Sequence, residues 1–436
     1  MLQTSIISQF IKYASLNALG MLGISCYILA DTFFIANGIG MEGLAALNLA
    51  IPVYSFIHGC ALMLGFGSAT KFSLAFSQNE QNRANAIFTN SLLGGICFAL
   101  FFIITGVCCS RPIAALLGAE KELLKMTNIY LKIILLFSPF FISNEIFLAF
   151  VRNDNAPALS MFAMICGSLS NILLDYIFIY PLKMGITGAA LATGIAPIIS
   201  MSILSVHLLR NNQNFHHQKH CFNMSIIGSS ITLGFPSLIA ELSSGLIMIV
   251  FNLIIMELAG SPGVAAYGII ANIALVTGAI YAGISQGIQP LISTAYGNHK
   301  SSDMYTYMKY SLVTVIILSG IIYYGIYKNA SEITILFNSK QIIELQTISE
   351  AGLILYFSSL LFTGINVILS VFFTSTDNPF PAHLLAILRG FVLVLPITYI
   401  LSSAYQLTGV WLSVPITELI TAIIGCIIWI KHKPQL

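Results

Sequence analysis

The chain contains 436 residues, of which 57% are hydrophobic and only 8% are charged, and its mean hydropathy is +0.90. A soluble globular domain carries about 25% charged residues, so this composition excludes that class of protein. The formal net charge is only +2, and a sequence without a run of basic residues gives no reason to expect nucleic acid as a partner.

Long apolar stretches recur from the beginning of the chain to its end. A helix needs about 20 residues to cross the hydrocarbon core of a bilayer, and no alternating strand pattern competes with these stretches. We therefore predict an all-α membrane protein with twelve transmembrane helices in two six-helix lobes. The predicted spans are residues 10–38, 43–76, 84–109, 122–150, 157–181, 187–209, 226–258, 263–297, 304–328, 345–375, 380–403 and 407–430.

The two halves of the chain repeat one another at a nearly constant offset. The string GMEGLAAL from Gly40 returns as GSPGVAAY from Gly260, 220 residues later, and ITGAAL from Ile186 returns as LTGVWL from Leu407. In a membrane protein, such a repeat indicates two similar bundles with a cavity between them. Gly40 and Gly260 each follow an odd-numbered span, so the halves share one orientation and the internal repeat is parallel.

The longest polar connection, RNNQNFHHQKHCFN, lies at the midpoint of the repeat. It predicts a first lobe over residues 1–209, a cytoplasmic linker over 210–225 and a second lobe over 226–436. An even number of spans places both termini on one side, and most of the 18 Lys and Arg residues fall in connections on that side. The positive-inside rule then predicts cytoplasmic termini and a multi-pass protein of the plasma (inner) membrane.

Four acidic residues interrupt apolar spans, namely Asp31, Asp175, Glu241 and Glu418. An acid at the centre of a membrane helix costs about 2.5 to 3.5 kcal/mol on insertion scales. Each of the four must therefore be protonated, paired with a cation or exposed to water. They are the first candidates for function.

Asp31 and Asp175 are predicted to form a cation-coupling site in the first lobe. Asn171 and Asp175 are one turn apart on the same helical face. Asp31 and Asp175 both fall roughly 10 Å below the outer helix ends, at 1.5 Å per residue. If the two carboxyl groups face each other, they load and unload protons. The alternative is a structural polar contact between the first and fifth spans.

In the second lobe, Glu241 lies mid-span with Ser243 and Ser244 beside it. It is either a functional acid facing the cavity or a protonated acid that is hydrogen-bonded within the bundle. For Glu418 a structural role is the favoured interpretation. A structural role is also favoured for Glu145, at the inner end of the fourth span, which could pair with Arg152.

Aromatic and methionine side chains recur on the second-lobe spans. They could line a cavity for aromatic cations, although packing or contact with lipid explains most such residues. The candidates for the substrate cavity are Met248, Phe251, Tyr267, Tyr281, Tyr356 and Phe357.

No metal site or cofactor is predicted. His216, His217, His220 and Cys221 are clustered, but they lie in the polar linker without the ligand spacing of a zinc site. The scattered cysteines have no CxxC spacing and fall mostly in apolar spans, where a thiol behaves as a small hydrophobe.

The first half of the chain resembles the multidrug and toxic compound extrusion (MATE) family in ADTFFIANGIGMEGLAALNLAIP from Ala30 and NILLDYIFIYPLKMGITGAALATG from Asn171. The second half is similar to its MepA-like bacterial branch in GFPSLIAELSSG from Gly234, GVAAYGIIANIA from Gly263 and GISQGIQPLIS from Gly283. The resemblance implies a V-shaped pair of lobes that exports amphipathic, mostly cationic drugs in exchange for protons or sodium ions.

Carried over by motif, the resemblance places the cation-coupling site, and with it a possible sodium site, on Asp31, Asn171, Asp175 and Thr193. It also places the second-lobe acid on Glu241. Some relatives have further acids in the seventh and eighth spans for a second-lobe sodium ion. The eighth span here has only Gln286 and Gln289, of which we include Gln286 in the predicted cavity. We therefore expect protons, with sodium as the alternative.

Other functions fit the sequence less well. A lipid-linked oligosaccharide flippase of the same superfamily is the nearest alternative, but it is expected to carry several Arg or Lys residues in its spans for a diphosphate. A membrane enzyme would need a motif such as HExxH, which the sequence lacks. GISQG from Gly283 matches GxSxG, but it lies inside an apolar span and not in the strand–turn–helix that gives this motif its chemistry. We expect a non-enzymatic, monomeric cation-coupled antiporter that works by alternating access.

Overall fold

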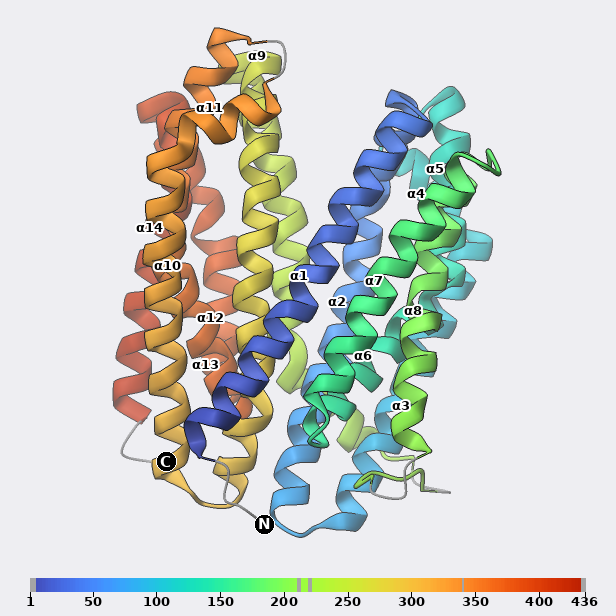
Figure 1. Ribbon diagram of the computed structural model, residues 1–436, viewed down its shortest axis with the longest axis vertical. Helices are drawn as coiled ribbons and strands as arrows, with labels where there is room; N and C mark the ends of the chain where they lie inside the picture. The colour runs from blue at the N-terminus through green and yellow to red at the C-terminus, as the bar shows by residue number, and fades with distance from the viewer. Residues whose placement is uncertain (1–4, 210–212, 219–221, 339–340, 433–436) are drawn as a thin grey trace.

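The protein is seen here in a computed structural model that describes residues 5–209, 213–218, 222–338 and 341–432. All regular elements in these ranges are helices, which confirms the predicted all-α fold class (Figure 1). Part of the predicted linker, including His220 and Cys221, lies outside the described residues. So do the two ends of the chain, residues 1–4 and 433–436.

The first half contains eight helices. They are α1 (Ile6–Gly38), α2 (Met41–Ser77), α3 (Gln81–Cys108), α4 (Ser110–Leu116), α5 (Lys121–Leu136), α6 (Ser138–Asn153), α7 (Pro157–Ile179) and α8 (Ile186–Leu208). The second half follows with α9 (Met224–Gly297), α10 (Ser301–Phe337), α11 (Ile343–Phe357), α12 (Leu360–Ser375), α13 (Pro379–Ile387), a π-helical segment (Leu388–Val392) and α14 (Val394–His432).

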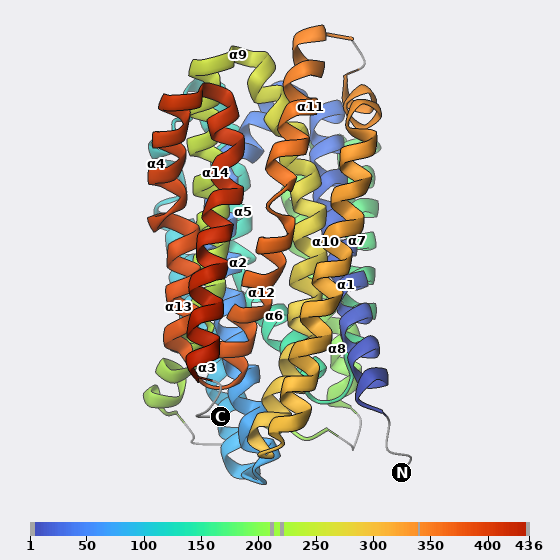
Figure 2. The same cartoon turned by 90° about the vertical axis from the view of Figure 1, so that its left-hand side faces the viewer.

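Among the described residues, eight helices are long and apolar enough to cross a membrane, or ten when each of two bent pairs is taken as one span. Three of these long helices contain a residue with non-helical backbone angles: α9 at Gly260, α10 at Asn329 and α14 at Gln406. Figure 2 shows α9 turning back at one end of the molecule. If the interruptions at Gly260 and Gln406 each separate two crossings, the predicted twelve spans result, and that number stays a prediction.

Two spans predicted as single helices are bent. The span predicted over 122–150 is divided into α5 and α6, which meet at 46°. Pro139 lies in the first turn of α6 and cannot donate the hydrogen bond that would continue α5. The span predicted over 345–375 is divided into α11 and α12 at 41°. There the hydroxyls of Ser358 and Ser359 bond back to carbonyls of the preceding turn, which bends helices.

The internal repeat extends to the backbone dihedral angles. Gly40 and Gly260 have φ values of 96° and 58° at the turns that open the two echoed strings. Gly185 (φ 58°, ψ −139°) and Gln406 (φ 53°, ψ −131°) match more closely, just before the second pair of strings. The left-handed region is unfavourable for residues with a Cβ atom, so glutamine at position 406 indicates that the turn geometry itself is required.

Two hydrophobic cores divide the molecule. One is built mainly from α1 to α8, and the other mainly from α9 to α14. Each lobe also receives part of a helix from the other half. Phe10, Tyr13 and Ala14 at the beginning of α1 belong to the second core, whereas Leu238 of α9 belongs to the first. Figure 1 shows α1 running diagonally between the two bundles. The predicted domain limits stay predictions.

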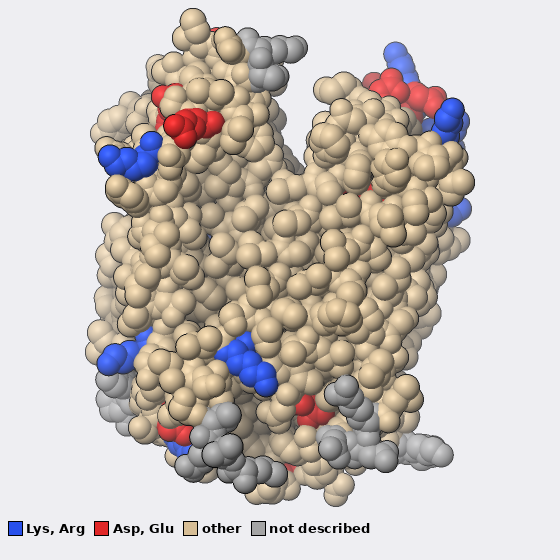
Figure 3. Space-filling model, viewed as in Figure 1, with Lys and Arg blue, Asp and Glu red and all other residues tan. Residues whose placement is uncertain are grey.

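The surface is divided into an uncharged belt and two charged ends. In Figure 3 the Lys, Arg, Asp and Glu side chains of the visible face gather at the two ends of the helices, with apolar and uncharged surface between them. The same view shows a cleft between the lobes that opens at the end opposite the start of α1. The chain is a multi-pass membrane protein with its lobes joined at one end.

Candidate functional site

The structure brings Asp31 of α1 and Asp175 of α7 together inside the first lobe. Their carboxyl groups are in direct polar contact, and the residues are 7% and 0% exposed. The two helices approach closely because α1 presents small residues to α7: Gly20 lies against Met164, and Gly23 lies against Ile165. A Cβ atom at Gly20 would lie 2.8 Å from the Met164 sulfur.

The two carboxyl groups have few hydrogen-bond partners. Apart from their mutual contact, Oδ1 of Asp31 and both carboxyl oxygens of Asp175 have no hydrogen-bond partner among the described residues. The same holds for the amide oxygen and nitrogen of Asn171, which is fully buried one turn before Asp175. Two ionised carboxylates in contact repel one another strongly, so this cluster requires a shared proton or a bound cation.

Thr193 of α8 joins the same region from a third helix. Its hydroxyl donates to the carbonyl of Ala189 at 3.1 Å and contacts the hydroxyl of Tyr130 on α5, which interacts electrostatically with both acids. The four predicted coupling residues thus come from three helices of the first lobe, and their binding of one ion stays a prediction. Their oxygen atoms are hard ligands that suit a proton or a small hard cation such as sodium.

A cavity of about 70 Å³ lies next to this cluster. The polar residues that line it include Tyr27, Tyr54, His58, Asn144, Glu145 and Thr193. The hydroxyls of Tyr27 and Tyr54 are 3.3 Å apart, and Tyr27 lies one turn before Asp31 on α1. The residues near this site that were not predicted from the sequence are Tyr27, Tyr54, Tyr130 and His58. For Tyr27 alone a signal existed, its spacing of four residues from Asp31.

The residues predicted to line a second-lobe cavity occupy several environments. Tyr281 and Phe357 are 1% exposed, inside the second core, and the Tyr281 hydroxyl contacts that of Ser319 at 2.7 Å. Tyr267 is also buried and stacks on Trp411. Their role in a substrate cavity stays a prediction, because helical spacing does not distinguish a core aromatic from one that faces a cavity.

Four further members of the predicted cavity are more accessible. Met248 is 38% exposed, and the half-buried Tyr356 packs edge-on against Phe357. Glu241 and Gln286 contact the first lobe. Glu241 lies 3.6 Å from His58, and Gln286 accepts a hydrogen bond from Arg152 at 2.9 Å.

Arg152 is bound differently from the sequence expectation. Among the ion pairs between described residues, none joins it to Glu145. Its guanidinium donates to the amide oxygens of Asn17 at 3.2 Å and Gln286 at 2.9 Å, and it is 3% exposed. The amides lie closer than Glu145 because α1 and α9 cross at this level. Arg152 therefore holds three helices together at the joined end of the lobes.

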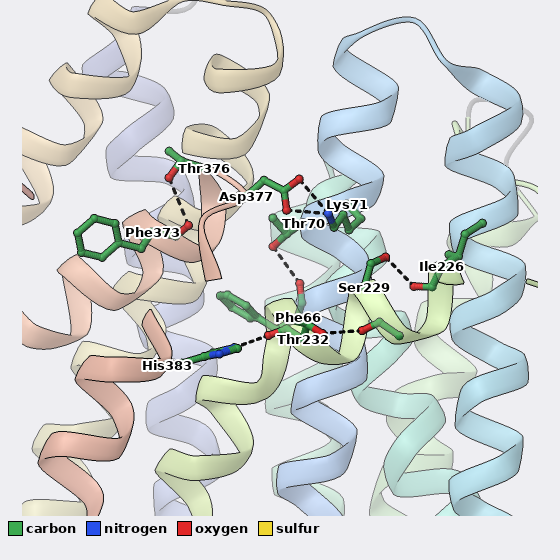
Figure 4. Close-up of polar contacts among 11 residues, drawn as sticks. Phe66, Thr70, Lys71, Ile226, Ser229, Thr232, Phe373, Thr376, Asp377 and His383 are labelled. Atoms are coloured by element: carbon green, nitrogen blue, oxygen red, sulfur yellow. Dashed lines mark hydrogen bonds and ion pairs between the residues drawn. The ribbon is translucent and has the colours of Figure 1, made fainter. Parts of the chain in front are cut away.

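An ion pair crosses between the lobes near the same end. Lys71 of α2 donates to both carboxylate oxygens of Asp377, which follows α12, at 2.7 and 2.8 Å. Nearby, His383 of α13 contacts the carbonyl of Thr232 on α9 at 2.6 Å. Figure 4 shows both contacts, the ion pair between the two halves of the chain and the histidine contact between α13 and the first part of α9. These contacts lie at the end of the molecule where the two lobes are joined.

The family model described as MatE matches residues 17–177 and 236–400. The chain belongs to the MatE family. The family predicted from the sequence is thereby confirmed. The two matched segments fall in the two halves of the internal repeat, with Asp31 and Asp175 in the first segment and Glu241 in the second.

Known members of the family resemble this chain over nearly its full length. Multidrug export protein MepA of Staphylococcus aureus (strain MRSA252) is 28% identical over 92% of this chain and 88% of its own. MepA of Staphylococcus saprophyticus is 25% identical over the same shares. A structure described as the outward-facing conformation of a multidrug resistance MATE family transporter has a TM-score of 0.93 at 22% identity, covering 100% of this chain and 97% of that one. That likeness shows the fold.

In this MatE chain, the second lobe has an acid that is paired with a cation. Glu418 of α14 accepts hydrogen bonds from Arg389 at 2.7 and 3.1 Å and from the amide of Asn366 at 2.6 Å. The π-helical segment that includes Arg389 widens the helix at this point, as π-bulges often do at polar sites. The pair supports the structural interpretation of Glu418.

Removal of Arg389 alone is expected to destabilise the protein. In Arg389→Gln the acid stays buried without its cation, which costs about 3 to 5 kcal/mol. Arg389→Met combined with Glu418→Gln removes both charges and is expected to recover most of that loss. Thermal unfolding of the purified proteins in detergent measures the difference. A melting temperature for Arg389→Gln equal to that of the wild type would contradict a structural pair.

Proposed function

We propose that this MatE chain is a multidrug efflux antiporter that exports amphipathic, mostly cationic compounds by alternating access. The observation that carries the proposal is the contact between the buried carboxyl groups of Asp31 and Asp175. A pair of acids with so few partners takes up a proton or cation and releases it when its surroundings change. The similarity to proteins named multidrug export protein MepA supports drugs as the substrates.

The proposed cycle uses two arrangements of the lobes. In the arrangement described here, the lobes are joined at the end where α1 begins and separated at the other (Figure 3). With α1 beginning in the cytoplasm, as the positive-inside rule predicts, this is the outward-open state of a protein in the inner membrane. Binding of the coupling ion must favour one arrangement and binding of the drug the other, because a ligand of equal affinity shifts nothing.

The coupling ion is proposed to be the proton. Asp31 and Asp175 lie close enough to share one, and a shared proton needs no further ligands. Sodium is the alternative, supported by the oxygen atoms of Asn171 and Thr193 beside the pair. Transport is proposed to need no cofactor, enzymatic step or second subunit, since one chain contains both lobes.

A flippase for lipid-linked oligosaccharides receives less support. Its diphosphate substrate would require free cationic side chains between the lobes. Arg152 and Arg389, two guanidinium groups within the helices, are bound to neighbouring amides and to Glu418, respectively. Apolar organic cations suit a surface with few charged side chains better than a diphosphate does.

Dye transport in proteoliposomes tests the proposal. A fluorescent organic cation is placed inside, and a pH gradient or a sodium gradient is imposed separately. We expect uphill export with the pH gradient alone. Export driven only by sodium would replace the proposed ion and retain the antiporter. Transport that neither gradient accelerates would contradict coupling.

A further inference from the structure

A second group of titratable side chains lies where the two lobes meet. His58, near the middle of α2, places Nδ1 3.6 Å from Oε2 of Glu241 on α9. The two side chains are 21% and 33% exposed, so neither is sealed inside a hydrophobic core. This pair connects the first half of the chain to the second and is separate from the Asp31–Asp175 contact.

The local packing fixes the two residues relative to each other. A Cβ atom at Gly59 would lie 2.8 Å from the Leu238 side chain and 3.2 Å from Cβ of Glu241, so α2 and α9 are in close contact at this level. One turn before His58, the ring of Tyr54 stacks on the imidazole with centroids 5.9 Å apart and planes 7° from parallel. An imidazolium on an aromatic face gains a cation–π attraction.

The site contains more acidic than basic groups. Glu241 of α9 and Glu145 of α6 both act electrostatically on His58, and Arg152 interacts with Glu145 from a distance. The hydroxyl of Tyr54, on the same helix as His58, and that of Tyr27 on α1 complete the titratable groups around the imidazole. Of the ion pairs between described residues, the one with His58 is the only one that involves Glu241.

We propose that His58 is an internal cation that competes with the organic cation for Glu241. The substrate's cationic group binds between Glu241 and Glu145, and the ring of Tyr54 forms one apolar wall. This inference rests on the proposed function and adds to it the residues that recognise the charge. It makes His58 the competing cation and Glu145 a partner of the substrate's charge, and neither role is suggested by the sequence alone.

The competition has a definite direction. When His58 is protonated, it neutralises Glu241, and an organic cation must displace it. When His58 is neutral, Glu241 is free to bind the substrate. A more acidic exterior therefore favours release of the drug in the outward-open state, which is the direction that export requires. Thr193 and Tyr27, beside the acid pair, line the same cavity as His58, so both sites respond to one body of solvent.

Equilibrium binding of tetraphenylphosphonium to the purified, full-length protein tests the inference. This probe carries a permanent positive charge and has no group that titrates. Its dissociation constant is measured between pH 5.5 and 8.5 for the wild type, His58→Gln and Glu241→Gln. A proton that competes for one site weakens binding by up to about tenfold per pH unit. We expect this slope in the wild type, a clearly smaller slope in His58→Gln, and at least about tenfold weaker binding at pH 8.5 in Glu241→Gln.

Two comparisons make the result decisive. His299→Gln changes an exposed histidine in the turn after α9 and is expected to keep the wild-type slope. Glu241→Asp keeps the charge and is expected to keep the pH dependence, which covers the case in which Glu241→Gln fails to fold. A wild-type slope in His58→Gln, or wild-type affinity in Glu241→Gln, would overturn the inference and leave the proposed function intact. Failure of the wild-type protein to bind the probe at any pH would overturn both.

Discussion

Asp31→Asn and Asp175→Asn are each expected to abolish coupled drug efflux. Asparagine has the size of aspartate but neither binds a proton in this pH range nor carries the negative charge that attracts a cation. Coupling free energies between two ligands are about 1 to 3 kcal/mol, or about 5- to 150-fold in affinity. Because the variant loses the ion site, it loses this coupling, and we expect the ion-driven efflux rate to fall to the level of cells that lack the protein.

Dye efflux from cells, corrected for the amount of protein in the membrane, measures this effect. Folding is expected to be near normal in both variants, because an amide can hydrogen-bond the remaining carboxyl group. Glu42→Gln is the matched control, since it neutralises an exposed acid in the first turn of α2. Wild-type efflux from both aspartate variants would refute the coupling role.

The structural alternative gives a different pattern of results. If the contact between Asp31 and Asp175 only holds α1 against α7, the asparagine variants should unfold at a different temperature, while efflux per folded molecule stays unchanged. Thermal unfolding and efflux measured on the same preparations therefore separate the two roles. Binding of an organic cation should persist in the asparagine variants if they have lost coupling alone.

The duplicated architecture could be predicted because the repeat is present in the residues themselves. The echoed strings at Gly40 and Gly260 begin at matching turns with positive φ. The bends within the spans were harder to predict. Pro139 marks one of them. At the other, Ser358 and Ser359 hydrogen-bond to carbonyls of the preceding turn, but in the sequence they cannot be distinguished from other serines in an apolar span.

The acid pair was predictable because charge in an apolar helix is costly and therefore conspicuous. Tyr130 and His58 give no such signal, since a tyrosine or histidine within a span is compatible with packing. The contact between Lys71 and Asp377 joins residues 306 positions apart, and no local pattern in the sequence reports which loops meet. Such pairs follow from how the helices cross, which the sequence alone does not specify.

The repeat also predicts where the lobes are most sensitive to mutation. Gly67 of α2 packs against the carbonyl of Ser230 on α9, and Gly287 of α9 packs against the carbonyl of Tyr13 on α1. The two glycines are 220 residues apart and equivalent in the two halves. A Cβ atom at either position would overlap backbone atoms of the other helix, which cannot rotate away as a side chain can.

Gly67→Ala and Gly287→Ala are therefore expected to open the joined end of the lobes. Overpacking costs about 1 to 3 kcal/mol, and here the strain is relieved when the two helices separate. A cost of that size changes the ratio of the two arrangements by about 5- to 150-fold. We expect efflux to fall strongly in both variants, because a transporter held in one arrangement cannot complete its cycle.

Electron–electron distances between spin labels at Glu42→Cys and Glu332→Cys report this shift, in a background without exposed native cysteines. Both positions are exposed. Glu42 lies in the first turn of α2 in the first half of the chain, and Glu332 lies near the end of α10 in the second. The distance should shorten in Gly67→Ala and Gly287→Ala, because the lobes approach at one end as they separate at the other. Gly245→Ala and Gly268→Ala place a methyl group in open space and should keep the wild-type distance. The same distances and efflux in all four variants would contradict the prediction. Close contact between the helices at Gly67 and Gly287 would then not be what keeps the lobes joined at that end.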